Sequence, residues 1–186
     1  MSGRPAVFLD RDGVLNQSFI GTDGVPRPPA GLAEFAIMEG VAEACRRLGA
    51  LGFLRIVVTN QPDVARGTQR REIVEAIHQR LREVVPVDDI RICYHDDDDL
   101  CDCRKPKPGL LVSAANDWGI DLAASFMVGD RWRDIEAGQR AGCTTILIDR
   151  HENPSLTLEP TVRVESLPSA VSWISERVAR ATGATR

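Results

Sequence analysis

The stretch "AVFLDRDGVLN" (residues 6–16) gives the clearest indication of the fold, because an uninterrupted apolar run in it ends abruptly in charged residues. Consecutive apolar residues without polar alternation are typical of a strand buried on both faces, as in a parallel sheet. Carboxylates that directly follow such a strand lie at the carboxyl edge of the sheet, where α/β proteins bind ligands. The stretch therefore predicts both a buried strand and a polar site at its end.

The rest of the chain repeats this pattern. Further short apolar or β-branched runs are "FLRIVVT" (53–59), "DIRICYH" (89–95), "SFMVGD" (125–130), "TTILID" (144–149) and "TVRVE" (161–165). Helical spacing between them predicts helices from Gly40, after Thr68 as N-cap, from Pro108 to Gly119, from about Asp134 to Gly142, and after Pro168. Alternating strands and helices predict an α/β fold, a doubly wound Rossmann-like parallel sheet flanked by helices.

Composition narrows the class of protein. With 186 residues, of which 43% are hydrophobic and 27% charged, the chain is expected to form one globular domain over residues 1–186. The net charge of -4 and the scattered basic residues argue against nucleic acid as a partner, and no apolar stretch suits a membrane span or a signal peptide. We expect a cytoplasmic monomer that acts on a small molecule.

The C-terminal tail, about 181–186, is predicted to be frayed, and the Gly- and Pro-rich residues 17–39 are expected to form an irregular excursion too small for a lid domain.

Polar residues gather at the predicted strand ends. In chain order they are Asp10, Arg11 and Asp12, then Thr59, Asn60 and Gln61, then Arg104 and Lys105, and finally Asp130 and Asp134. Carboxylates suit Mg²⁺, while a hydroxyl and an ammonium neutralise phosphate oxygens. The chain has only two lysines, and both lie in "CRKPKPG" (103–109), where a compact point charge suits phosphate. The set predicts a site for phosphoryl transfer.

Four of these stretches resemble the motifs of one known family. "FLDRDGVLN", "VVTNQ", "CRKPKPG" and "VGDRWRD" follow one another over residues 8–134 in the order found in the haloacid dehalogenase superfamily of aspartyl-phosphate phosphatases. The resemblance implies a Rossmann-like domain with a minimal cap. Each stretch alone has a simpler reading as a turn, a helix cap or a solvated surface charge. Their joint occurrence favours the phosphatase.

The resemblance implies a role for each matched residue. Asp10 would attack phosphorus, and Asp12 would first protonate the leaving group and then activate water. Mg²⁺ would be bound by the Asp10 carboxylate, the Asp12 backbone carbonyl and Asp130. Thr59 and Lys105 would bind phosphate oxygens, and Asp134 would orient a metal-bound water or the lysine.

A second metal site is predicted from cysteine spacing. Cys93, His95, Cys101 and Cys103 form a Cys-x-His pair, five intervening residues and a Cys-x-Cys pair. Four such ligands with no open position predict a structural Zn²⁺ in the loop 93–103, bracing the segment that carries Arg104 and Lys105. Cysteines are also common small core residues, and that reading suits Cys45 and Cys143. The run Asp96–Asp99 is expected to be a solvated loop tip, with another metal site as the alternative.

The cysteine pairs and "TNQPDVARG" (59–67) resemble a branch of the superfamily that contains heptose bisphosphate and histidinol-phosphate phosphatases. The resemblance favours a sugar bisphosphate and leaves histidinol phosphate as the second candidate. It implies substrate contacts from Arg11, Ser18, Phe19, Ile20, Gly21, Asn60, Gln61, Arg104 and Arg131. Arginines suit the distal phosphate of such a substrate.

Two other classes of protein share parts of this pattern. A phospho-acceptor receiver domain is disfavoured, because its phosphorylated aspartate follows a middle strand, whereas Asp10 follows the first. A catalytically silent, zinc-braced module that binds phosphate stays open, since an intact motif set does not prove turnover.

Overall fold

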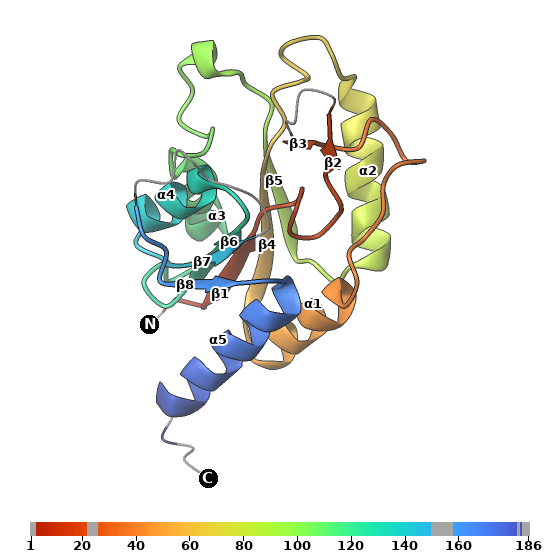
Figure 1. The fold of residues 1–186 in the computed structure, drawn as a ribbon. Helices are drawn as coiled ribbons and strands as arrows, with labels where there is room; N and C mark the ends of the chain where they lie inside the picture. The colour runs from red at the N-terminus through yellow and green to blue at the C-terminus, as the bar shows by residue number, and fades with distance from the viewer. Residues whose placement is uncertain (1–2, 22–25, 150–157, 182, 184–186) are drawn as a thin grey trace.

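One parallel sheet forms the centre of the protein, as predicted (Figure 1). In the computed structural model, residues 3–21, 26–149, 158–181 and 183 are described, so most of the predicted frayed tail lies outside the described residues. Six strands follow the order β5-β4-β1-β6-β7-β8, and every neighbouring pair is parallel. Their bounds are β1 Ala6–Leu9, β4 Leu54–Asn60, β5 Asp89–Cys93, β6 Phe126–Gly129, β7 Thr144–Ile148 and β8 Val162–Val164.

Helices cover both faces of the sheet. The first face carries α1 (Val41–Ala50), α2 (Arg71–Val84) and α5 (Leu167–Ala181), and the second carries α3 (Gly109–Trp118) and α4 (Trp132–Ala141). In β1, Val7 and Leu9 belong to the core of the first face and Ala6 and Phe8 to that of the second. Successive side chains of a strand point to opposite faces, so β1 must be apolar throughout. None of the described helices is long and apolar enough to cross a membrane.

Some helix boundaries differ from the predicted ones. Helix α2 begins at Arg71, and its N-cap residue is Arg70, so the prediction of Thr68 as N-cap is wrong. The Thr68 hydroxyl instead donates to the Asp63 carbonyl, which closes the preceding turn. Helix α4 begins two residues before Asp134, which lies in its first turn.

The excursion 17–39 and the loop after β5 contain short ordered pieces. Strands β2 (Phe19–Ile20) and β3 (Pro26–Arg27) pair antiparallel, and a single 3-10 turn, η1, spans Asp97–Asp99. Both pieces lie near the carboxyl edge of the sheet (Figure 1). They add side chains to that edge without forming a separate lid.

The strand order places the site. From β1 the chain proceeds outward through β4 and β5 and then returns to β6 on the other side of β1. The carboxyl ends of β4, β1 and β6 are therefore adjacent where the order reverses, which is where open α/β sheets bind ligands. Gly13 has a positive φ of 86°, and a Cβ there would lie 2.1 Å from Asp130 Oδ2. Glycine thus allows the turn after β1 to approach the end of β6.

Candidate active site and the Cys-His cluster

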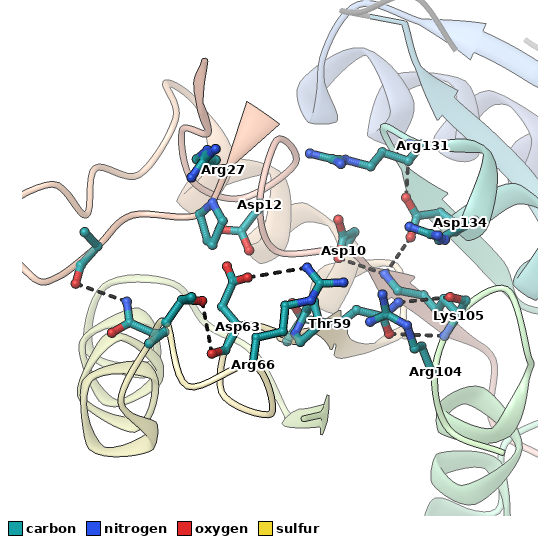
Figure 2. A pocket seen from close by; sticks show the side chains of 17 residues that line it. Asp10, Asp12, Arg27, Thr59, Asp63, Arg66, Arg104, Lys105, Arg131 and Asp134 are labelled. Carbon is teal, nitrogen blue, oxygen red and sulfur yellow. Dashed lines mark hydrogen bonds and ion pairs between the residues drawn. The ribbon is translucent and has the colours of Figure 1, made fainter. Parts of the chain in front are cut away.

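A cleft of about 550 Å³ opens at the carboxyl ends of β1, β4 and β6 (Figure 2). Eight of the residues predicted from sequence line it, from all four motifs. They are Asp10, Asp12, Thr59, Asn60, Arg104, Lys105, Arg131 and Asp134. Segments separated by more than a hundred residues thus meet at one site.

Lys105 lies at the centre of this cleft. Its Nζ donates to Asp10 Oδ1 at 2.8 Å, to Asp134 Oδ1 at 2.5 Å and to the Val58 carbonyl at 2.8 Å. The residue is 2% exposed, so it is not a solvated surface charge. Burial would lower the pKa of Lys105, but the carboxylates of Asp10 and Asp134 raise it above its ordinary value. The ammonium is therefore charged and fixed in direction.

Three carboxylates crowd beside this lysine. Oxygens of Asp10, Asp130 and Asp134 all lie within 4.8 Å of one another. Burial raises the pKa of Asp10 to about 6 although Lys105 opposes the rise, and burial together with Asp10 and Asp134 raises the pKa of Asp130 well above its usual range. Buried carboxylates that repel one another are stabilised by a shared cation, and hard oxygen donors suit Mg²⁺. The residues present therefore fit the predicted metal.

Hydrogen bonds from three side chains hold the carboxylate of Asp12. Its carboxylate accepts from Arg11 Nη2 at 2.8 Å, from Asn16 Nδ2 at 2.9 Å and from Gln61 Nε2 at 2.9 Å. Burial would raise the pKa of Asp12, but Arg11 and these hydrogen bonds lower it below its ordinary value. The carboxylate is therefore ionised in this state. Gln61 also donates to Thr59 Oγ1 at 2.9 Å, so one amide orients both residues.

Arg11 and Gln61 were predicted as substrate contacts, but in this structure they lie beneath the cleft. Arg11 is fully buried, and neither residue is among those lining the cleft. Asn60 lines it, and its side chain bonds the backbone N–H and carbonyl of Lys105 at 3.1 and 3.0 Å. These three residues hold the side chains of Asp12 and Thr59 and the backbone of Lys105 in place.

His78 was missed by the sequence analysis. It lies on the buried face of α2, and its Nε2 is 2.8 Å from Arg11 Nη1. Because arginine can only donate, Nε2 must accept and the ring proton must sit on Nδ1. Burial and the charge of Arg11 lower the pKa of His78 to about 3. Its only signal in the sequence is a position beside Ile77 on an otherwise apolar helix face.

We predict that His78 makes the fold acid-sensitive. The pKa of His78 is about 3 in the folded protein, against an ordinary value of 6.5, so below pH 6.5 the unfolded chain takes up a proton that the folded protein does not. The stability that depends on neutral His78 is therefore complete above pH 6.5 and is lost as pH falls towards 3. Glutamine at this position can accept from Arg11 but does not titrate. Between pH 7.5 and 5, wild type should lose about 2 kcal/mol more unfolding free energy than His78→Gln in urea titrations. Equal losses in both proteins would show that His78 titrates near its ordinary value.

Five arginines line the cleft and are called here the arginine rim: Arg27, Arg66, Arg104, Arg131 and Arg133. Figure 2 shows Arg27, Arg66, Arg104 and Arg131 around the carboxylates of Asp10 and Asp12. Arg104 and Arg131 were predicted, and the other three were not, although Arg66 lies within "TNQPDVARG" and Arg133 within "VGDRWRD". Of the predicted contacts in the excursion, Ser18, Phe19 and Gly21 are not among the described residues that line the cleft. The side chain of Ile20 lies outside the description.

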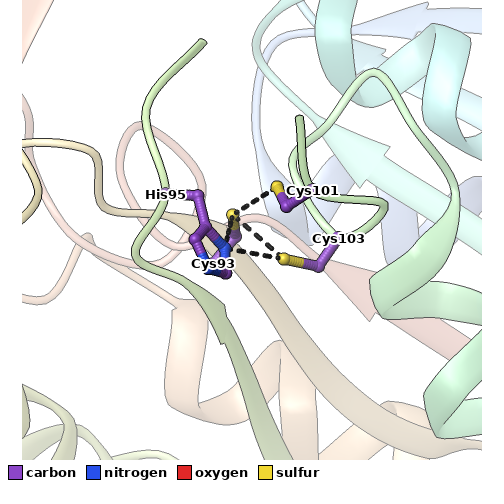
Figure 3. Close-up of side chains that lie close together, drawn as sticks. All are labelled: Cys93, His95, Cys101 and Cys103. Atoms are coloured by element: carbon purple, nitrogen blue, oxygen red, sulfur yellow. Dashed lines mark hydrogen bonds between the residues drawn. The ribbon is translucent and has the colours of Figure 1, made fainter. Parts of the chain in front are cut away.

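The four predicted zinc ligands converge at the end of β5 (Figure 3). Cys93 Sγ lies 3.6 Å from His95 Nδ1, 3.8 Å from Cys101 Sγ and 3.2 Å from Cys103 Sγ. Bonds of about 2.3 Å in a tetrahedral Zn²⁺ site place sulfur ligands about 3.8 Å apart, close to these separations. Burial and the neighbouring thiols raise the pKa of Cys93, so bound metal is what would favour its thiolate. The Cys-His cluster fits a closed zinc site, whereas Cys45 and Cys143 lie in the core as expected.

Asp97, Asp98 and Asp99 are exposed, as predicted for a loop tip, and Asp96 is half-buried; two of the four also pair with arginines of the rim. Asp96 Oδ2 accepts from Arg66 Nε at 2.7 Å, and Asp97 Oδ1 accepts from Arg104 Nε at 2.8 Å. Composition could not reveal these pairs, because they depend on how the loop after β5 folds against the rim.

Comparisons with known proteins agree with this geometry. A family profile described as HAD-hydrolase-like matches residues 102–170. A D-glycero-beta-D-manno-heptose-1,7-bisphosphate 7-phosphatase from Pseudomonas aeruginosa is 39% identical over 150 residues, which are 78% of this chain and 81% of that protein. A D-glycero-D-manno-heptose-1,7-bisphosphate 7-phosphatase from Thermosynechococcus vestitus is 36% identical over 95% of this chain and 98% of its own.

A solved structure shares the whole architecture. It is a D,D-heptose 1,7-bisphosphate phosphatase from B. bronchiseptica in complex with magnesium and phosphate. The TM-score is 0.79 at 31% sequence identity, with 93% of this chain and 99% of the other covered. The likeness therefore extends over nearly the whole of both chains.

Proposed function

This chain belongs to the haloacid dehalogenase-like hydrolases and, within them, to the D-glycero-D-manno-heptose 1,7-bisphosphate 7-phosphatases, from which we propose that it removes the 7-phosphate of that sugar. The observation that carries the proposal is the meeting of Asp10, Lys105 and Asp134 in a cleft lined by five of the described arginines, with the buried Asp130 beside them. The product would be the heptose 1-phosphate and inorganic phosphate.

In the proposed first step, a carboxylate oxygen of Asp10 attacks the 7-phosphorus and the bond to the sugar oxygen breaks. Lys105 keeps the nucleophile in place through its 2.8 Å hydrogen bond and offsets negative charge on the phosphoryl oxygens. The Thr59 hydroxyl, held by Gln61, faces the same oxygens. The carboxylates of Asp10 and Asp130 and the Asp12 backbone carbonyl would hold Mg²⁺, which would supply positive charge to offset the repulsion between nucleophile and substrate.

Asp12 acts in both half-reactions. In the free protein it is ionised, which is the form needed to take a proton from water in the second step. To protonate the leaving sugar oxygen in the first step it must be neutral. The negative charge of an incoming phosphate next to Asp12 raises its pKa and so favours that form. Arg11 and Asn16 keep the carboxylate aligned in both states.

The arginine rim favours a bisphosphate over histidinol phosphate. A second phosphate gains charge-assisted hydrogen bonds from Arg104 and Arg131, whereas the ammonium of histidinol phosphate is repelled by a cationic cleft. The same arginines also suit a silent phosphate-binding module. The buried Asp10–Lys105 pair favours the enzyme over such a module, because binding alone does not need a nucleophile.

The test is phosphate release by the purified protein with Mg²⁺, using both anomers of heptose 1,7-bisphosphate and histidinol phosphate. We expect kcat/KM for one heptose anomer to exceed that for histidinol phosphate by at least about 100-fold, or about 2.7 kcal/mol in transition-state binding. EDTA should abolish release, and Mg²⁺ should restore it. A preference for histidinol phosphate would contradict the proposed substrate, and no release from any ester would support the silent module.

We further propose that the protein works as a monomer in the cytoplasm on this small substrate, without nucleic acid or membrane. A cleft of about 550 Å³ suits a small substrate. Clustered free thiols suited to metal also fit a reducing compartment.

A further inference from the structure

The arginine rim has counter-ions outside the cleft, in the turn η1. Asp97 Oδ1 accepts from Arg104 Nε at 2.8 Å and lies 3.8 Å from Arg133 Nη2. Asp97 Oδ2 lies 3.8 Å from Arg66 Nη2. Asp97 does not itself line the cleft. One carboxylate therefore contacts three members of the rim without occupying the space that a substrate would fill.

The turn that presents Asp97 is fixed by its own neighbours. The Asp96 side chain accepts from the Asp97 backbone N–H at 2.8 Å, and Asp99 Oδ2 accepts from the Asp96 backbone N–H at 2.6 Å. The turn lies between His95 and Cys101, which both belong to the Cys-His cluster. The side chain of Asp97 takes no part in these turn-closing bonds, so its carboxylate can pair with the arginines.

Arg104 is the member of the rim most constrained by this arrangement. Its side chain is 8% exposed, and besides Asp97 it bonds the His95 carbonyl through Nη1 at 3.2 Å. These two bonds use two of the five N–H groups of the guanidinium. Arg104 Nη2 lies 3.9 Å from Asp96 Oδ1, beyond hydrogen-bond distance, and because Arg104 also lines the cleft, its remaining donors are available to an anion that binds there.

We propose that Asp97 is a positioning residue that orients Arg104 towards the second phosphate of the substrate and so sets the preference for a bisphosphate over a monophosphate. The inference rests on the proposed function. An unrestrained arginine samples many rotamers, and binding an anion must then order it. A carboxylate that is 58% exposed screens its partner only weakly, so its orienting effect outweighs its screening effect.

Three variants separate the orienting effect of Asp97 on Arg104 from the effect of its charge. Each is assayed with heptose 1,7-bisphosphate and with p-nitrophenyl phosphate, which has no second phosphate. Asp97→Ala should raise KM for the bisphosphate about tenfold with kcat unchanged. A change of this size lies within the range of interaction energies found between residues in contact. Asp97→Asn keeps an oxygen that accepts from Arg104 Nε and should stay within about threefold of wild type. Asp98→Ala removes the same charge from the same turn, but Asp98 contacts no arginine among the described residues, so its kinetics should match wild type. None of the three should alter p-nitrophenyl phosphate hydrolysis.

Several results would overturn the inference. Equal effects of Asp97→Ala and Asp98→Ala would mean that net charge alone matters. A lower KM in Asp97→Ala would show that Asp97 competes with substrate for the arginines. An equal rise in KM for p-nitrophenyl phosphate, or a loss of zinc or melting temperature, would indicate general damage to the loop. If wild type itself does not prefer the bisphosphate, the proposed function fails together with this inference, whereas an unchanged preference in Asp97→Ala overturns the inference alone.

Discussion

Asp10→Asn is expected to abolish turnover, lowering kcat by roughly four to six orders of magnitude, because the amide keeps the shape of the carboxylate but not its nucleophilicity. Binding should survive, since Lys105 and the arginine rim are unchanged. Burst and steady-state phosphate release at saturating substrate measure the loss. Asp98→Asn, the same substitution at an exposed site, is the matched control.

The same substitution should not weaken the fold. A carboxyl group whose folded pKa is raised destabilises the native state above that pKa, and burial raises the pKa of Asp10 to about 6. Removing this charge at pH 7.5 without metal should therefore leave the melting temperature equal to or above that of wild type, with zinc content unchanged. Activity within tenfold of wild type would refute Asp10 as nucleophile. Lost activity with a collapsed melting temperature would instead mean that Asp10 serves the fold.

Cys101→Ser is expected to produce the largest loss of stability. A hydroxyl is a poor replacement for a thiolate on Zn²⁺, and the binding energy of a structural zinc is also folding energy. We expect the protein to lose its zinc and at least about 3 kcal/mol of stability, which corresponds to roughly 6–12 °C in melting temperature for a chain of this size. Elemental analysis and thermal unfolding measure the two effects.

Activity should fall in the same variant, because Arg104 and Lys105 directly follow the cluster residue Cys103. Cys143→Ala is the control, since it removes a core thiol outside the cluster and should keep zinc. If Cys101→Ser retains a full complement of zinc, the four residues do not form the site. Zinc loss with normal kinetics would mean that the loop holds Lys105 without the metal.

Much of this site could be predicted, because the end of a buried strand is visible in the sequence as the end of an apolar run. Buried strands such as β1 must be apolar on both faces, so the position of Asp10 at the carboxyl edge follows directly from the pattern. The same holds for Thr59 in the last two residues of β4 and for Asp130 directly after β6. Cys93 is the last residue of β5 and His95 follows two residues later, a spacing that likewise brings two ligands together.

Residues that act through tertiary packing were not predictable. Thr68 has a good N-cap side chain, yet its backbone N–H bonds the Asp63 carbonyl and keeps it in the preceding turn. His78 reaches Arg11 only because α2 packs against the loop after β1. Arg27 reaches the cleft only through the pairing of β2 with β3, and periodicity carries no information about such contacts.

The placement of the arginine rim has an evolutionary consequence. The nucleophile and its partners sit at ends of central strands, where the sheet dictates their positions, whereas Arg27, Arg66 and Arg133 come from a hairpin, a loop and a helix start. Loops and helix ends tolerate substitution far better than buried strands. Exchanging rim arginines can therefore change which phosphate ester is accepted while the hydrolytic chemistry stays intact, so a lineage with this fold can acquire new substrates by a few surface substitutions.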